Sequence, residues 1–132
     1  MDNYLNIYIA IIDDDDSICR SMSRLLRAAH FQPIAYSSAE AFLTDTNRPK
    51  FACLVLDIQL KGMSGLDLSK RLRAVKDTTP VVFITAQDNP DIRVQAEASD
   101  CAGYFRKTDS GSDVLAAIRR TISDKNRAGV MS

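Results

Sequence analysis

Five short apolar runs, spaced along the whole chain, constrain the fold more than any other feature of the sequence. They cover residues 7–12, 33–36, 52–56, 81–84 and 103–105, and the third and fourth runs are apolar at every residue. A strand with one wet face alternates apolar and polar residues, whereas a strand buried on both faces is continuously apolar. The pattern therefore predicts a parallel sheet that is covered on both sides.

Segments with helical spacing lie between these runs. Their apolar residues recur three or four positions apart, at Ile18, Met22, Leu25, Leu26 and Ala29, at Leu68, Leu72 and Val75, and at Val114, Leu115, Ile118 and Ile122. Two shorter helices are predicted over 39–43 and 92–98. Strand and helix then alternate five times, and right-handed crossovers place helices on both faces of the sheet. We predict a flavodoxin-like α/β fold, a doubly wound five-stranded parallel sheet of order 2-1-3-4-5 with five helices on two faces.

The length of 132 residues, 45% of them hydrophobic, suits one domain. We expect this domain to span 1–124, with 125–132 as a flexible C-terminal tail or linker stub. No apolar run approaches the ~20 residues of a membrane span, and no basic segment of a secretion signal opens the chain. These observations favour a cytoplasmic protein. Cys19, Cys53 and Cys101 lack metal-binding spacing and are expected to be buried free thiols.

The charges cancel, with 17 basic and 17 acidic side chains. This balance argues against direct binding to nucleic acid or to an anionic membrane. The acidic residues are unevenly placed, however, because residues 13–16 are four consecutive Asp. Asp15 or Asp16 can cap the helix that follows. Capping leaves Asp13 and Asp14 without an explanation, and Asp is also a good ligand for hard cations.

Polar residues end four of the predicted strands. They are Asp13 with Asp14, Asp57, Thr85 and Lys107. Each alone has an ordinary structural explanation, but in a parallel sheet all of them reach the same edge. Carboxylates held together need a cation, and Mg²⁺ is suited to carboxylates and phosphate oxygens. Asp57, which follows a central apolar strand, is then the best nucleophile for an aspartyl phosphate, with Lys107 and Thr85 neutralising the phosphoryl oxygens.

These residues carry a resemblance to a known family. The matching pieces are Ile12-Asp13-Asp14-Asp15, Leu56-Asp57, Gly62-Met63-Ser64-Gly65, Ile84-Thr85-Ala86, and Tyr104 three residues before Lys107. Over residues 5–124 the chain resembles the receiver domain of two-component response regulators. Residues 36–43 are also similar to receivers that are joined to helix-turn-helix output domains.

The resemblance implies a phosphoacceptor that turns over no external substrate. Asp57 would receive the phosphoryl group from a histidine kinase or a phosphotransfer protein. Mg²⁺ would be the cofactor, held by Asp14 directly, by Asp13 largely through water, by the Asp57 carboxylate and by the Gln59 carbonyl.

The resemblance also implies a switch. Lys107 would pair with the phosphoryl group, while Thr85 and Tyr104 would report phosphorylation to the surface. That surface comprises the helix at 92–98, the strand at 103–105 and the last helix, and it would contact an output domain or a partner protein. A homodimer that forms on phosphorylation stays open at this point.

Two departures from the family pattern keep other functions open. Thr108 follows Lys107 where the family usually has a cis proline, so we predict a trans peptide here because a non-proline cis bond costs ~3–4 kcal/mol. Lys61 also replaces a customary proline, which predicts a looser loop after Asp57. A phosphorylation-independent interaction domain is therefore one alternative. A Mg²⁺-dependent aspartyl-phosphate hydrolase is another, although Gln59 stands where such enzymes usually need a second acid.

Overall fold

A single parallel sheet organises the domain. The computed structural model describes the backbone of residues 6–131 and the side chains of residues 6–124. The strand order is β2-β1-β3-β4-β5, and every neighbouring pair is parallel, as the sequence predicts. The strands are β1 (Tyr8–Ile12), β2 (Gln32–Tyr36), β3 (Phe51–Asp57), β4 (Val81–Thr85) and β5 (Gly103–Arg106).

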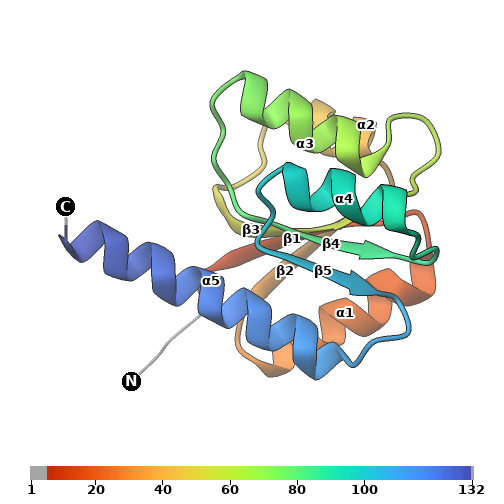
Figure 1. Ribbon diagram of the computed structural model, residues 1–132. Helices are drawn as coiled ribbons and strands as arrows, with labels where there is room; N and C mark the ends of the chain where they lie inside the picture. The colour runs from red at the N-terminus through yellow and green to blue at the C-terminus, as the bar shows by residue number, and fades with distance from the viewer. Residues whose placement is uncertain (1–5, 132) are drawn as a thin grey trace.

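Five helices cover the sheet in two layers. Helices α1 (Asp16–Ala28) and α5 (Gly111–Met131) lie on one face, and α2 (Ala39–Thr44), α3 (Gly65–Ala74) and α4 (Pro90–Ala98) lie on the other (Figure 1). The predicted doubly wound fold is confirmed. None of the helices in the described part of the chain combines the length and the apolar content needed to cross a membrane.

The core is divided by the sheet into two apolar clusters. Alternate strand residues face the α2–α3–α4 layer, namely Ala10, Ile12, Leu54, Leu56, Val81 and Phe83. The intervening residues face α1 and α5, namely Ile9, Ile11, Cys53, Val55, Val82 and Ile84. Because both faces of β3 and β4 are buried in apolar side chains, the continuous apolar runs of the sequence are explained.

The helix starts follow side-chain capping. Asp15 rather than Asp16 caps α1, since its carboxylate accepts hydrogen bonds from the Ser17 N–H at 2.9 Å and the Ser17 hydroxyl at 2.7 Å. Ser38 caps α2 in the same way by accepting from the Ala41 N–H at 2.9 Å. Local capping therefore accounts for one residue of the four-Asp run, and the other carboxylates are left for a different role.

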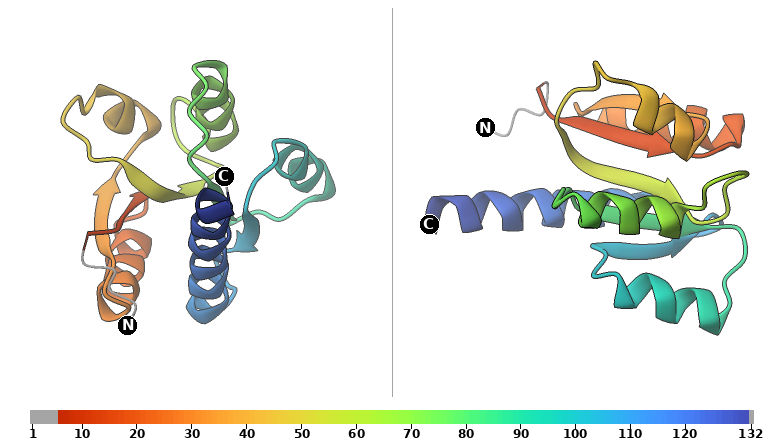
Figure 2. Two further views of the ribbon diagram at one scale, coloured as in Figure 1. Left: turned by 90° about the vertical axis from the view of Figure 1, so that its left-hand side faces the viewer. Right: turned by 90° about the horizontal axis from the view of Figure 1, so that it is seen from above.

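The structure corrects three expectations. Helix α5 continues to Met131, so the backbone of the expected tail is helical up to that residue and extends past the sheet (Figure 2). Val75 is 71% exposed instead of joining the buried stripe, because α3 ends at Ala74 and Val75 is its C-cap. Of the three free thiols only Cys53 is buried, while Cys19 and Cys101 are half-buried.

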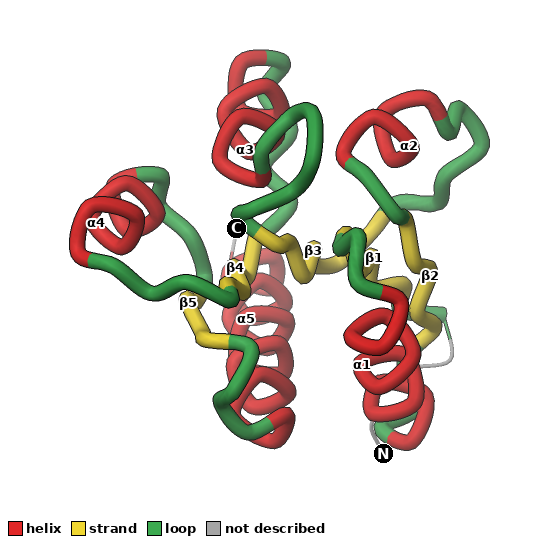
Figure 3. The backbone as a smooth tube through the Cα atoms, turned by 90° about the vertical axis from the view of Figure 1, so that its right-hand side faces the viewer, coloured by secondary structure: helices red, strands yellow, loops and turns green. Residues whose placement is uncertain are grey.

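The carboxyl ends of the strands meet at one edge of the sheet. Figure 3 looks toward this edge, where the loops that lead from the strands into α1, α3, α4 and α5 gather. The order in which successive strands are added to the sheet reverses between β1 and β3, which is where doubly wound folds bind their ligands. The fold thus directs attention to the residues that end β1 and β3.

Candidate functional site

Three carboxylates meet at the edge between β1 and β3. Asp13 follows β1 and Asp57 ends β3, and their side chains are almost completely buried. Asp14 is exposed beside them. One carboxylate oxygen from each residue lies within 4.8 Å of the others, a spacing that suits a shared metal ion. The structure therefore brings together the three acids that the sequence predicts as metal ligands.

Lys107 joins two of these carboxylates. Its Nζ donates hydrogen bonds to Asp13 Oδ1 and to Asp57 Oδ2, both at 3.1 Å, and lies 3.0 Å from Asp13 Oδ2. The backbone N–H of Lys107 bonds to the Thr85 carbonyl at 2.8 Å, which ties the loop after β5 to β4. Burial would lower the pKa of Lys107, but the hydrogen bonds with Asp13 and Asp57 outweigh it and the pKa is raised. Lys107 is thus a permanent cation within the acidic site.

Asp13 carries the clearest sign that the site is short of positive charge. Its Oδ2 is buried and accepts no hydrogen bond from the described residues, so its contact with Lys107 is ionic only. Burial is the main reason that the pKa of Asp13 rises from 3.8 to about 6, and the nearby Asp57 charge adds to the effect. Three carboxylates face one ammonium, which leaves an excess of negative charge. A divalent cation that prefers oxygen ligands fits this donor set.

The loop between β3 and α3 lies against the acidic residues. The Gln59 N–H donates to Asp57 Oδ1 at 3.0 Å, and the Lys61 N–H donates to Asp14 Oδ2 at 3.3 Å. Gly65 begins α3 directly against Asp57, where an added Cβ would lie 2.1 Å from the Asp57 carbonyl oxygen. Only glycine therefore allows α3 to start so close to Asp57.

Thr85 reaches the predicted edge but bonds elsewhere. Its side chain is fully buried at the end of β4. The hydroxyl donates to the Gln87 carbonyl at 3.0 Å and accepts from the Gln87 N–H at 3.1 Å. The Thr85 hydroxyl thus holds the turn after β4, while the direct contacts of the acidic site are made by Lys107.

Tyr104 is held at the surface of β5. Its hydroxyl donates to Asp88 Oδ1 at 2.9 Å, and the Arg93 guanidinium carbon lies 5.1 Å from its ring centre. Arg93 also forms an ion pair with Glu97 at 3.1 Å. Burial, followed by the hydrogen bond to Asp88, raises the pKa of Tyr104 to about 12. The predicted switch residue therefore has a defined set of partners from the β4–α4 segment.

Two residues at the site were not singled out from the sequence. Gln87 accepts a hydrogen bond at 3.0 Å from the Gln59 side chain and so links the loops that follow β3 and β4. Glu40 accepts the Met63 N–H at 2.9 Å from the first turn of α2. Their only sequence signal is proximity to recognised motifs, since Gln87 follows Ile84-Thr85-Ala86 and Glu40 lies in the 36–43 segment.

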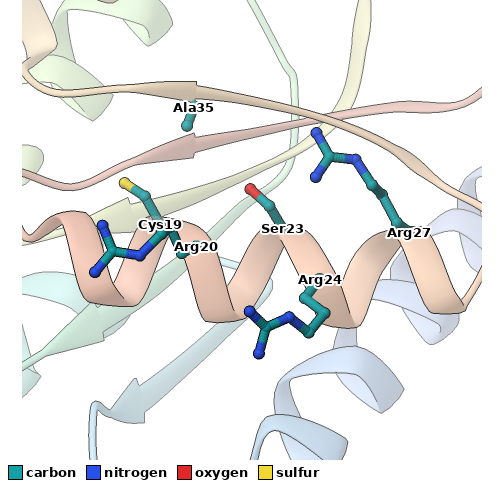
Figure 4. A pocket seen from close by; sticks show the side chains of 6 residues that line it. All are labelled: Cys19, Arg20, Ser23, Arg24, Arg27 and Ala35. Carbon is teal, nitrogen blue, oxygen red and sulfur yellow. The ribbon is translucent and has the colours of Figure 1, made fainter.

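The predicted trans peptide after Lys107 is confirmed, as the part of the chain between residues 6 and 131 contains no cis bond. A groove of about 440 Å³ lies away from this site, between α1 and β2. Figure 4 shows its lining residues, with Ser23 turned toward the strand and Arg24 turned away from it. Because the groove is lined by arginines and small residues without a carboxylate, it offers no cation site.

Comparison with known proteins gives a consistent result. Residues 9–119 match the family model described as the response regulator receiver domain. The response regulator protein TodT of Pseudomonas putida is 32% identical over 114 residues, which is 86% of this chain and 50% of that protein. The sensory transduction protein RegX3 of Mycobacterium tuberculosis is 30% identical over 114 residues, again 86% of this chain and 50% of that protein. The chain thus spans about half the length of the curated relatives it matches.

Solved structures agree with the fold. The response regulator StyR superposes with a TM-score of 0.81 at 31% identity, covering 94% of this chain and 64% of that one. A CheY-like receiver domain protein from Methanospirillum hungatei superposes with a TM-score of 0.84 at 20% identity, covering 92% and 98%. The second similarity supports the fold alone.

Proposed function

Because the chain belongs to the response regulator receiver domain family, we propose that Asp57 accepts a phosphoryl group from a histidine kinase or a phosphotransfer protein. The observation that carries this proposal is the pairing of Lys107 with both Asp57 and Asp13 at 3.1 Å in a cluster of three carboxylates. An ammonium at this place can neutralise a phosphoryl group on Asp57 without a new side chain entering the site.

Asp57 is the group that suits nucleophilic attack. It is buried at the end of a central strand, with one carboxylate oxygen held by the Gln59 N–H and the other by Lys107. These two contacts hold both carboxylate oxygens in place at the carboxyl edge of the sheet. In the proposed reaction a new bond forms between a carboxylate oxygen and phosphorus, the bond between phosphorus and the donor nitrogen breaks, and the imidazole takes a proton.

Asp13, Asp14, Asp57 and the Gln59 carbonyl would hold Mg²⁺. When bound, this ion neutralises charge on the carboxylates and on the phosphoryl oxygens. Asp13 Oδ2, whose contact with Lys107 is ionic only, and the raised pKa of Asp13 support a cation at this place. Asp14, which is exposed, leaves the site accessible from solvent.

Phosphorylation would be reported through Thr85 and Tyr104. The Thr85 hydroxyl can exchange its bonds with Gln87 for a phosphoryl oxygen, which would release the turn after β4. Tyr104 would then leave Asp88 and Arg93 and turn inward, as a shift between two populated states. The surface that changes comprises α4, β5 and α5, and we propose that it binds an output domain or a partner protein.

The remaining assignments follow from the same proposal. We expect a module that works in the cytoplasm, where its phosphodonor is found, and that turns over no external substrate.

We also propose that the phosphorylated surface of α4, β5 and α5 can pair with a second copy. Analytical ultracentrifugation with and without phosphorylation tests this pairing, and an unchanged monomer in both states would contradict it.

The direct test is phosphate uptake from a small donor. Incubation with Mg²⁺ and acetyl phosphate should add one phosphate to the intact mass, and addition of EDTA should prevent it. Asp57→Asn should abolish uptake, because the amide cannot attack phosphorus. Uptake that is equal in this variant would refute the assignment of Asp57. Failure of the parent protein to bind Mg²⁺ or beryllofluoride would instead favour an interaction domain that works without phosphate.

A further inference from the structure

The hydrogen bond between Glu40 and the β3–α3 loop has no part in the function described so far. The Glu40 carboxylate is exposed and lies in the first turn of α2, while Met63 lies in the loop that joins Asp57 to α3. Glu40 Oε2 accepts the Met63 N–H at 2.9 Å. This hydrogen bond is the main reason that the pKa of Glu40 is lowered, so the carboxylate is ionised and accepts strongly at neutral pH.

The packing of α2 against the core fixes the backbone around Glu40. Ala39 and Phe42, on either side of Glu40 in this short helix, are buried in the core. The Phe42 ring packs against the rings of Tyr36 and Phe51, with centres 5.2 Å and 6.0 Å away. The backbone that carries Glu40 is therefore fixed by the packing of its neighbours in the core.

The loop is shaped to receive this carboxylate. Gly62 adopts a φ of +77°, and a Cβ at this position would lie 2.6 Å from Glu40 Oε2. The backbone conformation therefore favours glycine, and a side chain at this position would displace the Glu40 carboxylate from the loop. At the base of the loop, the Gly65 N–H bonds to the Ile58 carbonyl at 3.0 Å.

The same loop contacts the metal ligands. Lys61, two residues before Met63, donates its N–H to Asp14 Oδ2 at 3.3 Å. Gln59 donates its N–H to Asp57 Oδ1 at 3.0 Å. A hydrogen bond that fixes Met63 therefore also restricts the Gln59 and Lys61 N–H groups, which bind the carboxylates of the acidic site. The same hydrogen bond restrains a loop in which Lys61, unlike a proline, leaves its own φ angle free.

We propose that Glu40 is a positioning residue that holds the β3–α3 loop in the conformation needed for Mg²⁺ binding. The inference rests on the proposed function for its biological meaning, because Mg²⁺ is the cofactor of that function. Its first test is made without metal and without phosphate. The two proposals can therefore fail separately.

The first measurement is solvent exchange of the Met63 amide proton by NMR in Mg²⁺-free protein. Glu40→Ala removes the acceptor, and we expect exchange to become about five- to tenfold faster, as for the loss of one hydrogen bond of ordinary strength at an exposed site. Glu40→Gln keeps a carbonyl oxygen at the same distance along the side chain and should stay within about threefold of the parent protein. Asp91→Ala is the matched control, since it removes another exposed acid from the first turn of a helix, α4, and should leave Met63 unchanged.

The second measurement separates positioning from general stability. Calorimetric titration should show Mg²⁺ binding about three- to tenfold weaker in Glu40→Ala, with near-normal binding in Glu40→Gln. Phosphate uptake at saturating Mg²⁺ should stay within about twofold of the parent protein, because the acidic residues themselves are intact. Unchanged exchange at Met63 in Glu40→Ala would overturn the proposal. Faster exchange with unchanged Mg²⁺ affinity would also overturn it, since Glu40 would then be structural only.

Discussion

In the interior of the sheet, β3 and β4 bury apolar side chains on both faces, whereas the same two strands end in Asp57 and Thr85, which are polar and equally buried. The interior is closed by packing against the two helical layers. The edge instead gathers three carboxylates, two of which bind Lys107, and among the described residues nothing donates a hydrogen bond to the buried Asp13 Oδ2. The interior therefore stabilises the fold, while the edge holds carboxylates whose negative charge exceeds that of the Lys107 ammonium.

This difference explains why the chemistry lies at the ends of the strands. A buried carboxylate in the apolar interior would have no partners and would be strongly disfavoured. At the edge, Asp13 and Asp57 gain Lys107 and backbone N–H donors while staying shielded from solvent. Three carboxylates with one ammonium leave an excess of negative charge at this edge, and the proposed cation would offset it.

The largest effect on stability is expected from a change in the interior. Phe83 is fully buried in the cluster under α2, α3 and α4. Phe83→Ala should lower the free energy of unfolding by about 3–5 kcal/mol, because it removes apolar contacts and leaves a cavity. Urea denaturation measures this loss, and Val94→Ala, at a 65% exposed position, should cost under about 0.5 kcal/mol. Equal losses of unfolding free energy in the two variants would contradict the conclusion that the apolar interior stabilises the fold.

A change at the edge should act in the opposite direction. Asp13 releases its proton near pH 3.8 when unfolded and at about 6 when folded, so the stability of the folded state falls as the pH rises between these values. Asp13→Asn removes this cost and should raise the unfolding free energy of Mg²⁺-free protein at pH 7.5 by about 1–3 kcal/mol. The advantage should shrink as the pH falls through 6 toward 4. Thermal melting across this pH range measures both outcomes.

Asp13→Asn should also weaken Mg²⁺ binding, so that the stability of the fold and the affinity for Mg²⁺ change in opposite directions. Asp16→Asn is the matched control, because Asp16 is an exposed neighbour at the start of α1 and outside the metal cluster. It should neither stabilise the protein nor weaken Mg²⁺ binding. A loss of stability in Asp13→Asn at pH 7.5 would show that the edge is not an electrostatic cost to the fold.

The smallest effect is expected at the surface next to the site. Arg93→Ala removes the cation above the Tyr104 ring and the ion pair with Glu97, but both contacts are largely exposed. The unfolding free energy should fall by about 0.5–1 kcal/mol. Arg120→Ala, on the exposed side of α5, should change it by less. The NMR signals of the Tyr104 ring should shift only in Arg93→Ala. Identical ring signals in both variants would show that Arg93 does not influence Tyr104.

Much of the sheet could be predicted from the sequence because burial on both faces leaves a plain pattern. The continuous apolar runs at 52–56 and 81–84 lie within β3 and β4, and each strand extends one residue further to Asp57 and Thr85. The polar residues that follow the runs also lie at one edge, since a parallel sheet aligns the ends of its strands. The side chains of Asp13, Asp57 and Lys107 meet for this reason.

The remaining details depend on contacts that no periodic pattern encodes. Thr85 bonds to Gln87 because of the turn that follows β4, and Glu40 in α2 accepts a hydrogen bond from Met63, 23 residues away in the loop after β3. Val75 continues the helical spacing, yet the helix has already ended before it. The absence of an apolar stripe in 125–132 predicts a tail, but a helix that has begun can continue without one, and α5 extends to Met131.

The most direct test of the central claim is to locate the phosphate. An aspartyl phosphate is reduced by borohydride to homoserine, whereas phosphates on Ser or Thr are not, so peptide sequencing by mass spectrometry identifies the modified residue. After treatment with Mg²⁺ and acetyl phosphate, we predict homoserine at position 57 and at neither Asp13 nor Asp14. Homoserine at one of those two positions, or at none, would contradict the account.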